Sequence, residues 1–401
     1  MLTRRKVTAI LSTLAVAGAR PARAQTPAGA PLVIGVPMPL TGVLAQGGQT
    51  ILAGIQYAAD QANKNGGVLG RPVKLLVGDT RSEPNTAATV ATRMATEDKV
   101  FAFVGGYGST ADFAMLQSIR RYKPIFIHTA SSSVRLEQSF GKEDWYYHIY
   151  IWDYHRQKAA ARFLGAIQPR PNTVALAYED GLYGSDAAKY AEQYLRAAGF
   201  DLIMKEPFKT GSPDFSPVLT RVKSRDPDVF ISIGYSGDNI QLIRQESSLG
   251  VRPKLTIVVT AGDKRSDYAD FGDGVAVIAE WAPEEQVPGN AEWVEKVMAN
   301  TTMTSIAPPF LQGYTGLSSL LTSVAAANST EPAAVLLALD GGTFDTPYGR
   351  LSYRPSEGGA KHQLLTDENM VLVQFRVQGE DVVLPAGKAS GRLIYPIRPA
   401  L

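Results

Sequence analysis

The chain has 401 residues, a formal net charge of +2, 45% hydrophobic residues and no cysteine. This near-balanced charge gives no case for a nucleic-acid partner, and without cysteine neither a disulfide nor a lipid-modified cysteine is possible. With no cysteine and only four histidines, a metal site or a histidine-based catalytic triad has little support, and we expect no cofactor.

The first 24 residues have the features of a cleavable export signal. Residues 3–6 are basic, residues 7–18 are apolar, and Ala22-Arg23-Ala24 matches an Ala-x-Ala cleavage site. The apolar stretch is shorter than the roughly 20 residues that span a bilayer. Paired arginines at residues 4 and 5 favour twin-arginine export, with a general secretory signal as the alternative. Without residues 1–24 the net charge becomes −3, and we expect a mature protein free in the periplasm.

From residue 31 onward, short apolar strands alternate with amphipathic helices. The first block has expected strands at 32–36, 73–77, 101–104 and 125–128, and helices at 51–63, 84–96 and 110–121. After Trp152 the alternation restarts, with strands at 174–178, 202–204, 229–233, 255–259 and 275–279, and helices at 155–167, 184–198, 214–224 and 238–248. Helices at 289–300, 309–327 and 331–339 precede a strand-like tail from Gly349.

Continuous apolar strands between amphipathic helices are typical of parallel sheets that are covered on both faces. The chain that remains after the export signal is longer than the ~250–300 residues at which a single core stops growing. The sequence therefore predicts an α/β protein with two lobes.

Two loops carry the candidate site. Ser109 and Thr110 follow one strand and open a helix, and residues 131–133 are three serines that follow the next strand. Free N–H groups at a helix start, together with hydroxyl groups, can hold a carboxylate without any lysine or arginine. Each hydrogen bond to a charged group contributes about 1.5–3 kcal/mol, so no buried cation is required for micromolar binding. The alternative is that these serines only cap helices.

Two other chemistries fit the same loop less well. Residues 106–111 fit a relaxed Gly-x-Gly-x-x-Ala dinucleotide fingerprint, but they do not open the first βαβ unit and no ribose-binding acid follows the next strand. A periplasmic α/β hydrolase with Ser109 as nucleophile is the rival of another class. Such a nucleophile needs a histidine or lysine within hydrogen-bond reach, and the sequence predicts none there.

Seven segments match one family in order and spacing. They are residues 37–42 (PMPLTG), 53–63 (AGIQYAADQAN), 79–80 (DT), 104–109 (VGGYGS), 178–184 (YEDGLYG), 212–215 (SPDF) and 234–235 (GY). Together they resemble the periplasmic leucine/isoleucine/valine-binding proteins, the amino-acid-type solute receptors of ABC importers. The resemblance covers about residues 32–376, nearly the whole mature chain.

The resemblance implies a type I periplasmic binding fold, with two doubly wound parallel-sheet lobes joined by three crossings. Lobe 1 would comprise residues 31–149 and 281–349, and lobe 2 residues 150–280 and 350–390. A non-enzymatic receptor of this kind buries one small solute between its lobes by hinge closure, and an inner-membrane ABC permease recognises the closed form. It would most simply be a monomer.

The resemblance also implies which residues contact the solute. A carboxylate would be held by Ser109 and by the second loop, here Ala130, Ser131 and Ser132. The opposite lobe would bring down two tyrosines, Tyr183 and Tyr235. Tyr107 and Trp152 would add aromatic surface suited to a ring, although Trp152 is as readily explained as hinge packing.

Two departures from the family pattern bear on the solute. Gln46 and Gly47 stand where the family usually has an aromatic residue, which enlarges the pocket. No carboxylate lies at residues 260–262, where the family's acid for an α-ammonium is expected, and Asp263 is the nearby substitute. An unpaired ammonium in a desolvated cleft costs several kcal/mol, so a carboxylate without an amine, or an amide, is favoured. Receptors for aromatic acids, or for short amides or urea, are the rivals within this class.

Overall fold

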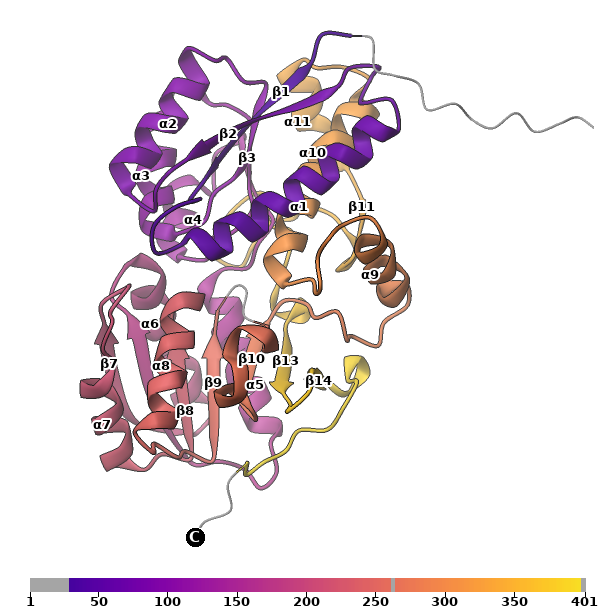
Figure 1. The fold of residues 1–401 in the computed structure, drawn as a ribbon. Coiled ribbons are helices and arrows are strands. Elements are labelled where there is room, and N and C mark those ends of the chain that lie inside the picture. Colours follow the sequence, from indigo (N-terminus) through magenta and orange to yellow (C-terminus); the bar gives the residue numbers. More distant parts are fainter. Residues whose placement is uncertain (1–28, 261–263, 398–401) are drawn as a thin grey trace, which may run out of the picture.

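The computed structural model describes residues 29–260 and 264–397, which form two lobes, one above the other in Figure 1. The predicted export signal lies outside the described residues. The upper lobe contains a five-stranded parallel sheet in the order β2-β1-β3-β4-β5. Its strands are β1 (Leu32–Met38), β2 (Val73–Asp79), β3 (Ala102–Gly105), β4 (Phe126–His128) and β5 (Tyr146–His148).

Helices cover both faces of the upper sheet (Figure 1). One face carries α2 (Pro84–Thr96) and α3 (Ser109–Ile119), with α4 (Val134–Phe140) beside them. The other carries α1 (Ala45–Lys64), α10 (Pro308–Ala327) and α11 (Pro332–Gly341), while α9 (Asn290–Ala299) precedes α10. Glycines let α1 and α10 approach closely, because a Cβ at Gly54 would lie 1.9 Å from the Phe310 carbonyl oxygen.

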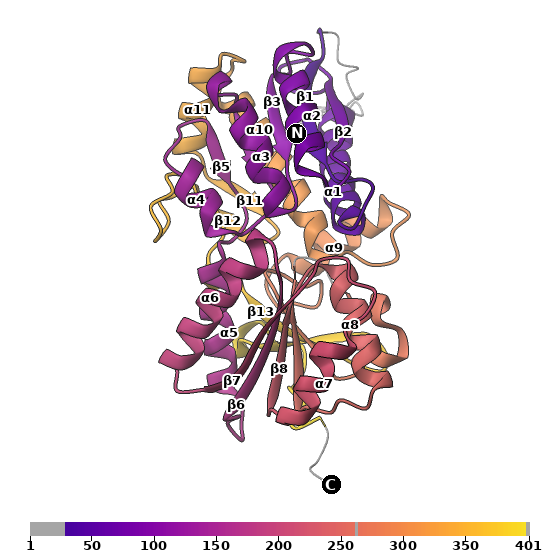
Figure 2. The ribbon, with the colours of Figure 1, turned by 90° about the vertical axis from the view of Figure 1, so that its left-hand side faces the viewer.

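The lower lobe is built on a seven-stranded sheet in the order β14-β13-β10-β9-β8-β6-β7. Five strands run parallel: β6 (Thr173–Glu179), β7 (Asp201–Phe208), β8 (Val229–Ile233), β9 (Leu255–Val259) and β10 (Ala276–Ala279). Two antiparallel strands extend one edge, β13 (Val371–Phe375) and β14 (Glu380–Leu384). Figure 2 shows α5 (Asp153–Ala166) and α6 (Leu182–Ala197) on one face, and α7 (Ser216–Arg225) and α8 (Ser236–Ser248) on the other.

The chain passes between the two sheets three times. The first passage joins β5 to α5, and the second joins β10 to α9. The third joins β12 to β13. Before it, residues 344–346 and 349–351 form a small hairpin (β11 and β12), and along it Gln363 hydrogen-bonds to His148 at the end of β5. The prediction of two parallel-sheet α/β lobes is therefore confirmed, whereas the exact residues that divide the lobes stay a prediction.

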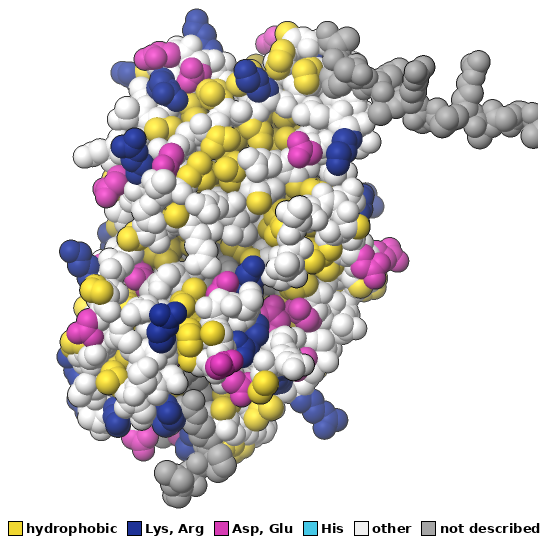
Figure 3. Space-filling view, viewed as in Figure 1, with side chains coloured by type: hydrophobic (Ala, Val, Ile, Leu, Met, Phe, Trp, Pro, Cys, Tyr) yellow, Lys and Arg dark blue, Asp and Glu magenta, His cyan; other side chains and the backbone are white. Residues whose placement is uncertain are grey.

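Apolar side chains fill both lobes, and the surface is mixed. On the face drawn in Figure 3, lysine and arginine side chains are interspersed with acidic ones. Across the described ranges, no helix combines the length and the apolar character that crossing a bilayer demands.

Candidate functional site

The parallel strands of both sheets end at the gap between the lobes. In each sheet the strand order reverses next to the lobe's first strand, so that β1 lies between β2 and β3, and β6 lies between β7 and β8. Ligands of open α/β sheets bind outside the carboxyl ends of strands at such reversal points. The loops that follow β3, β4, β6 and β8 meet there.

These loops enclose a small cavity of about 20 Å³, enough for roughly one water molecule. Lobe 1 and the first crossing contribute Tyr107, Gly108, Ser109, Ser131, Ser132 and Tyr150 to its lining, and lobe 2 contributes Arg156, Tyr183, Gly234 and Tyr235. A solute larger than water can enter only if the lobes part or if side chains rotate.

The start of α3 forms one wall of the cavity. Ser109 is 1% exposed, and its hydroxyl oxygen lies 3.4 Å from the backbone nitrogen of Ser133. Gly106 has φ of +94°, and a Cβ there would lie 2.5 Å from the His128 ring, so only glycine allows this close turn into the helix. The N–H groups of the first helical turn have no partner inside the helix, and Gly108 and Ser109 at this helix start line the cavity.

Serines of the second loop donate their hydroxyl protons to carboxylates of the chain itself. Ser131 donates to Asp112 at 2.7 Å, and Ser132 donates to Asp153 at 2.6 Å. Ser131 also has φ of +69°, a strained conformation for a residue with a side chain. These hydroxyls therefore fix the shape of the loop, and toward a solute they present oxygen lone pairs and the neighbouring backbone.

Three tyrosines from the two lobes meet across the gap. The ring of Tyr107 stands edge-on to Tyr235 at 5.7 Å, and the rings of Tyr183 and Tyr235 lie 5.3 Å apart. The Tyr183 hydroxyl donates to the Val259 carbonyl oxygen at 2.8 Å. Because that proton is engaged, Tyr183 offers a solute mainly its ring.

A buried arginine at this site was missed in the sequence, from which we inferred only that binding requires no buried cation. Arg156 lies on α5, is 1% exposed and lines the cavity. Its guanidinium donates to the hydroxyls of Tyr183, at 3.0 Å, and Tyr150. It also lies over both rings, 5.2 Å from the centroid of Tyr150 and 5.7 Å from that of Tyr183.

Four other predicted site residues lie outside the cavity lining. Thr110 accepts a hydrogen bond from the Leu182 nitrogen of the opposite lobe at 3.3 Å, and Ala130 is buried directly before Ser131. Gln46 is exposed and borders a separate hollow. Trp152 is fully buried and stacks on His148 at 3.7 Å, while Asp263 lies outside the described residues. Contact of any of these residues with a solute stays a prediction.

Comparison with known proteins identifies the family. Residues 31–380 match the family model described as periplasmic binding protein. The chain belongs to this family. Among curated relatives of this periplasmic binding protein is Leu/Ile/Val-binding protein homolog 7 of Brucella melitensis, 26% identical over 343 residues, covering 82% of this chain and 85% of the relative.

Solved structures share the fold of this periplasmic binding protein. One is a solute-binding protein of an ABC transporter from R. palustris in complex with benzoate, with TM-score 0.77, 15% identity, and coverage of 92% of this chain and 98% of that one. Another is the branched-chain amino acid transporter substrate-binding protein LivJ from Streptococcus pneumoniae in complex with isoleucine, with TM-score 0.75, 19% identity, and coverage of 91% and 99%.

The histidines closest to the second loop of this periplasmic binding protein are engaged elsewhere. His128 bonds Tyr146 through one ring nitrogen and Asp112 through the other, at 2.6 and 2.9 Å. His148 bonds Gln363 and the Ser131 carbonyl oxygen, both at 3.0 Å. Among the described residues, the hydrogen bonds of neither ring leave a nitrogen to act as a base for Ser109.

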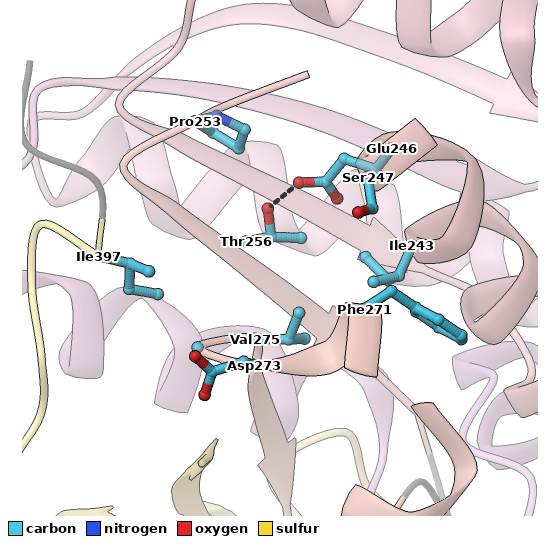
Figure 4. A pocket seen from close by; sticks show the side chains of 10 residues that line it. Ile243, Glu246, Ser247, Pro253, Thr256, Phe271, Asp273, Val275 and Ile397 are labelled. Atoms are coloured by element: carbon cyan, nitrogen blue, oxygen red, sulfur yellow. Dashed lines mark hydrogen bonds between the residues drawn. The ribbon is translucent and has the colours of Figure 1, made fainter. Parts of the chain in front are cut away.

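A second cavity of about 20 Å³ lies in the lower lobe, away from the gap between the lobes. Figure 4 shows Ile243 and Glu246 of α8, Thr256 of β9, and Phe271 around it. The Thr256 hydroxyl donates to Glu246 at 2.7 Å. This cavity holds no more than about one water, and it lies within one lobe, so hinge motion does not enlarge it.

Proposed function

We propose that the protein is the periplasmic solute-binding component of an ABC importer of the branched-chain amino acid type. It binds a small carboxylate or amide solute between its lobes, and an inner-membrane permease recognises the closed form. The single observation that supports this most is the cavity lined from both lobes, with the start of α3 on one side and Tyr183 and Tyr235 on the other. Membership of the periplasmic binding protein family adds to it.

Closure of the lobes explains how such a site works. In the closed arrangement water is excluded, so electrostatic contacts inside the gap become stronger than they are in solution. The described structure encloses only about 20 Å³ between the lobes, and opening of the hinge would admit a larger solute. Three extended crossings can absorb that motion without unfolding either sheet.

A receptor for aromatic acids is the second candidate. Tyr107, Tyr183 and Tyr235 surround the cavity with ring faces and edges, against which an aromatic solute would pack. The R. palustris relative of the same fold was solved with benzoate.

A thermal-shift screen of the exported protein tests the proposed function. Leucine, isoleucine, benzoate, benzamide and urea are titrated separately, because a solute that binds only the folded state raises the melting temperature. We expect a saturable rise with at least one carboxylate or amide and no change in the solute after prolonged incubation. Turnover of the solute, detected by chromatography, would identify an enzyme instead, and a flat response to the whole set contradicts the proposal.

A further inference from the structure

The cavity holds a positive charge that no carboxylate of the described chain pairs with. Arg156 makes its hydrogen bonds to two tyrosine hydroxyls, and its Nε–H has no partner among the residues that the structure describes. Arg156 forms no ion pair with any residue in 29–260 or 264–397. It is only 1% exposed, so bulk water does not solvate its charge. A buried charge without a counter-charge is costly, and five N–H donors leave several of them available.

The described residues of the cavity lining supply no acid to offset this charge. They comprise tyrosines, serines and glycines besides Arg156. The carboxylates behind the loop, Asp112 and Asp153, are bonded to Ser131 and Ser132 and do not line the cavity. An ammonium group placed in this cavity would therefore meet the guanidinium and none of these acids.

One buried acid does sense Arg156 through space. The pKa of Glu280 is raised to about 7. Burial raises it and outweighs the hydrogen bond from Gln312 and the charge of Arg156, which both lower it. The Glu280 carboxylate accepts from Gln312 at 2.6 Å, and within the described part of the chain its other oxygen has no partner. Since Glu280 forms no ion pair with Arg156, the guanidinium remains free to bind a carboxylate of the solute.

We infer that Arg156 selects the solute, binding the carboxylate of a ring-bearing acid that lacks an ammonium group. The inference rests on the proposed function and narrows it to one class of solute. The carboxylate lies between the Arg156 guanidinium and the start of α3, two positively polarised groups on opposite lobes. The ring packs among Tyr107, Tyr183 and Tyr235.

Isothermal titration with matched probes tests this choice of solute. Benzoate, benzamide and phenylalanine share a ring and differ in the carboxylate or in an added ammonium group. The wild-type protein is expected to bind benzoate at least tenfold more tightly than either of the other two. Phenylalanine or benzamide binding as tightly as benzoate overturns the inference and leaves the proposed function standing.

Substitution of Arg156 provides the second arm. Arg156→Gln should weaken benzoate binding more than tenfold and leave the weak benzamide binding within threefold, while Arg156→Lys, which keeps the charge, should retain part of the preference. Arg162→Gln is the matched control, because Arg162 lies on the same helix, is 47% exposed and pairs with Asp367 outside the cavity. Equal benzoate affinity in the wild type and Arg156→Gln refutes the role. If Arg156→Gln does not fold, as judged by circular dichroism, the wild-type comparison still decides.

Discussion

At the scale of single residues, the site depends on polar groups that are buried before any solute arrives. Asp112 accepts from both His128 and Ser131, and Asp153 accepts from Ser132. Burial raises the pKa of Asp153 well above its ordinary value, although the hydrogen bond from Ser132 lowers it. Such networks hold a strained loop in one conformation. Because the loop is already ordered, little conformational entropy is lost when a solute binds.

Glu280 gives a prediction on pH and stability. Burial raises its pKa from 4.5 to about 7, so its contribution to stability is fully present below pH 4.5 and is lost as the pH rises through 7. Glu280→Gln mimics the protonated form. The free energy of unfolding of Glu280→Gln, relative to that of the wild type, should therefore rise between pH 5 and pH 8. The expected rise in this difference is on the order of 2–3 kcal/mol.

Urea denaturation at pH 5 and pH 8 measures this difference. Glu97→Gln, which removes an exposed acid at the end of α2, serves as the control and should show no comparable dependence on pH. An equal effect of Glu280→Gln at both pH values would show that Glu280 does not titrate in this range.

The same scale shows why the sequence revealed only part of the site. Ser109, Ser131 and Tyr183 could be located because they follow apolar strands or match family segments. Arg156 could not, because a charged residue in a helix normally faces solvent. Its burial comes from Tyr150 and Tyr183, which the fold brings in from other elements. The one local signal in the sequence was that residues 153–157 show no apolar stripe, and the structure buries all five of them on α5.

At the scale of elements, the periodicity of the sequence predicted most helices and strands to within a few residues. The helix at 84–96 was predicted with its observed bounds, because Pro84 marks its start and alanines form its buried face. The prediction omitted β5 and α4. The strand has three aromatic and histidine residues and the helix has seven residues, so each is too short to show a period.

Close packing of α1 on α10 supports a prediction about stability. A Cβ at Gly54 would lie 1.9 Å from the Phe310 carbonyl oxygen, so Gly54→Ala must force the two helices apart. We expect the free energy of unfolding to fall by about 1–3 kcal/mol. Chemical denaturation measures the change.

Gly165→Ala is the matched control for this substitution. Gly165 is exposed on α5, and no atom of residues 29–260 or 264–397 lies within 4 Å of the position its Cβ would take. Alanine there should leave stability unchanged or raise it by up to about 1 kcal/mol, because glycine is the poorer helix former. The packing argument fails if both variants behave alike.

At the scale of the whole molecule, contacts beside the hinge hold the two lobes together. Asp186 on α6 accepts hydrogen bonds from the Ser133 hydroxyl and, at 3.3 Å, from the Arg135 backbone nitrogen of the upper lobe. The Arg135 side chain adds an ion pair to Asp186 at 3.3 Å. Together with the Thr110–Leu182 contact, these bonds stabilise the closed arrangement.

Removal of this contact should shift the molecule toward an open form. Asp186→Ala is expected to increase the radius of gyration of the solute-free protein, measured by small-angle X-ray scattering. Solute affinity should fall roughly three- to thirtyfold, since the closed state becomes less populated. Glu192→Ala is the control, because Glu192 lies on the same helix and pairs with Arg196 and Lys205 of its own lobe. Unchanged scattering and affinity for Asp186→Ala would rule out this role.

A crystal structure of the protein grown with benzoate tests the central claim most directly. The account predicts electron density for benzoate between the lobes, with its carboxylate within hydrogen-bond distance of Arg156 and of the start of α3, and its ring against Tyr183 and Tyr235. Density for benzoate at any other place, with the gap between the lobes closed as described, would contradict it.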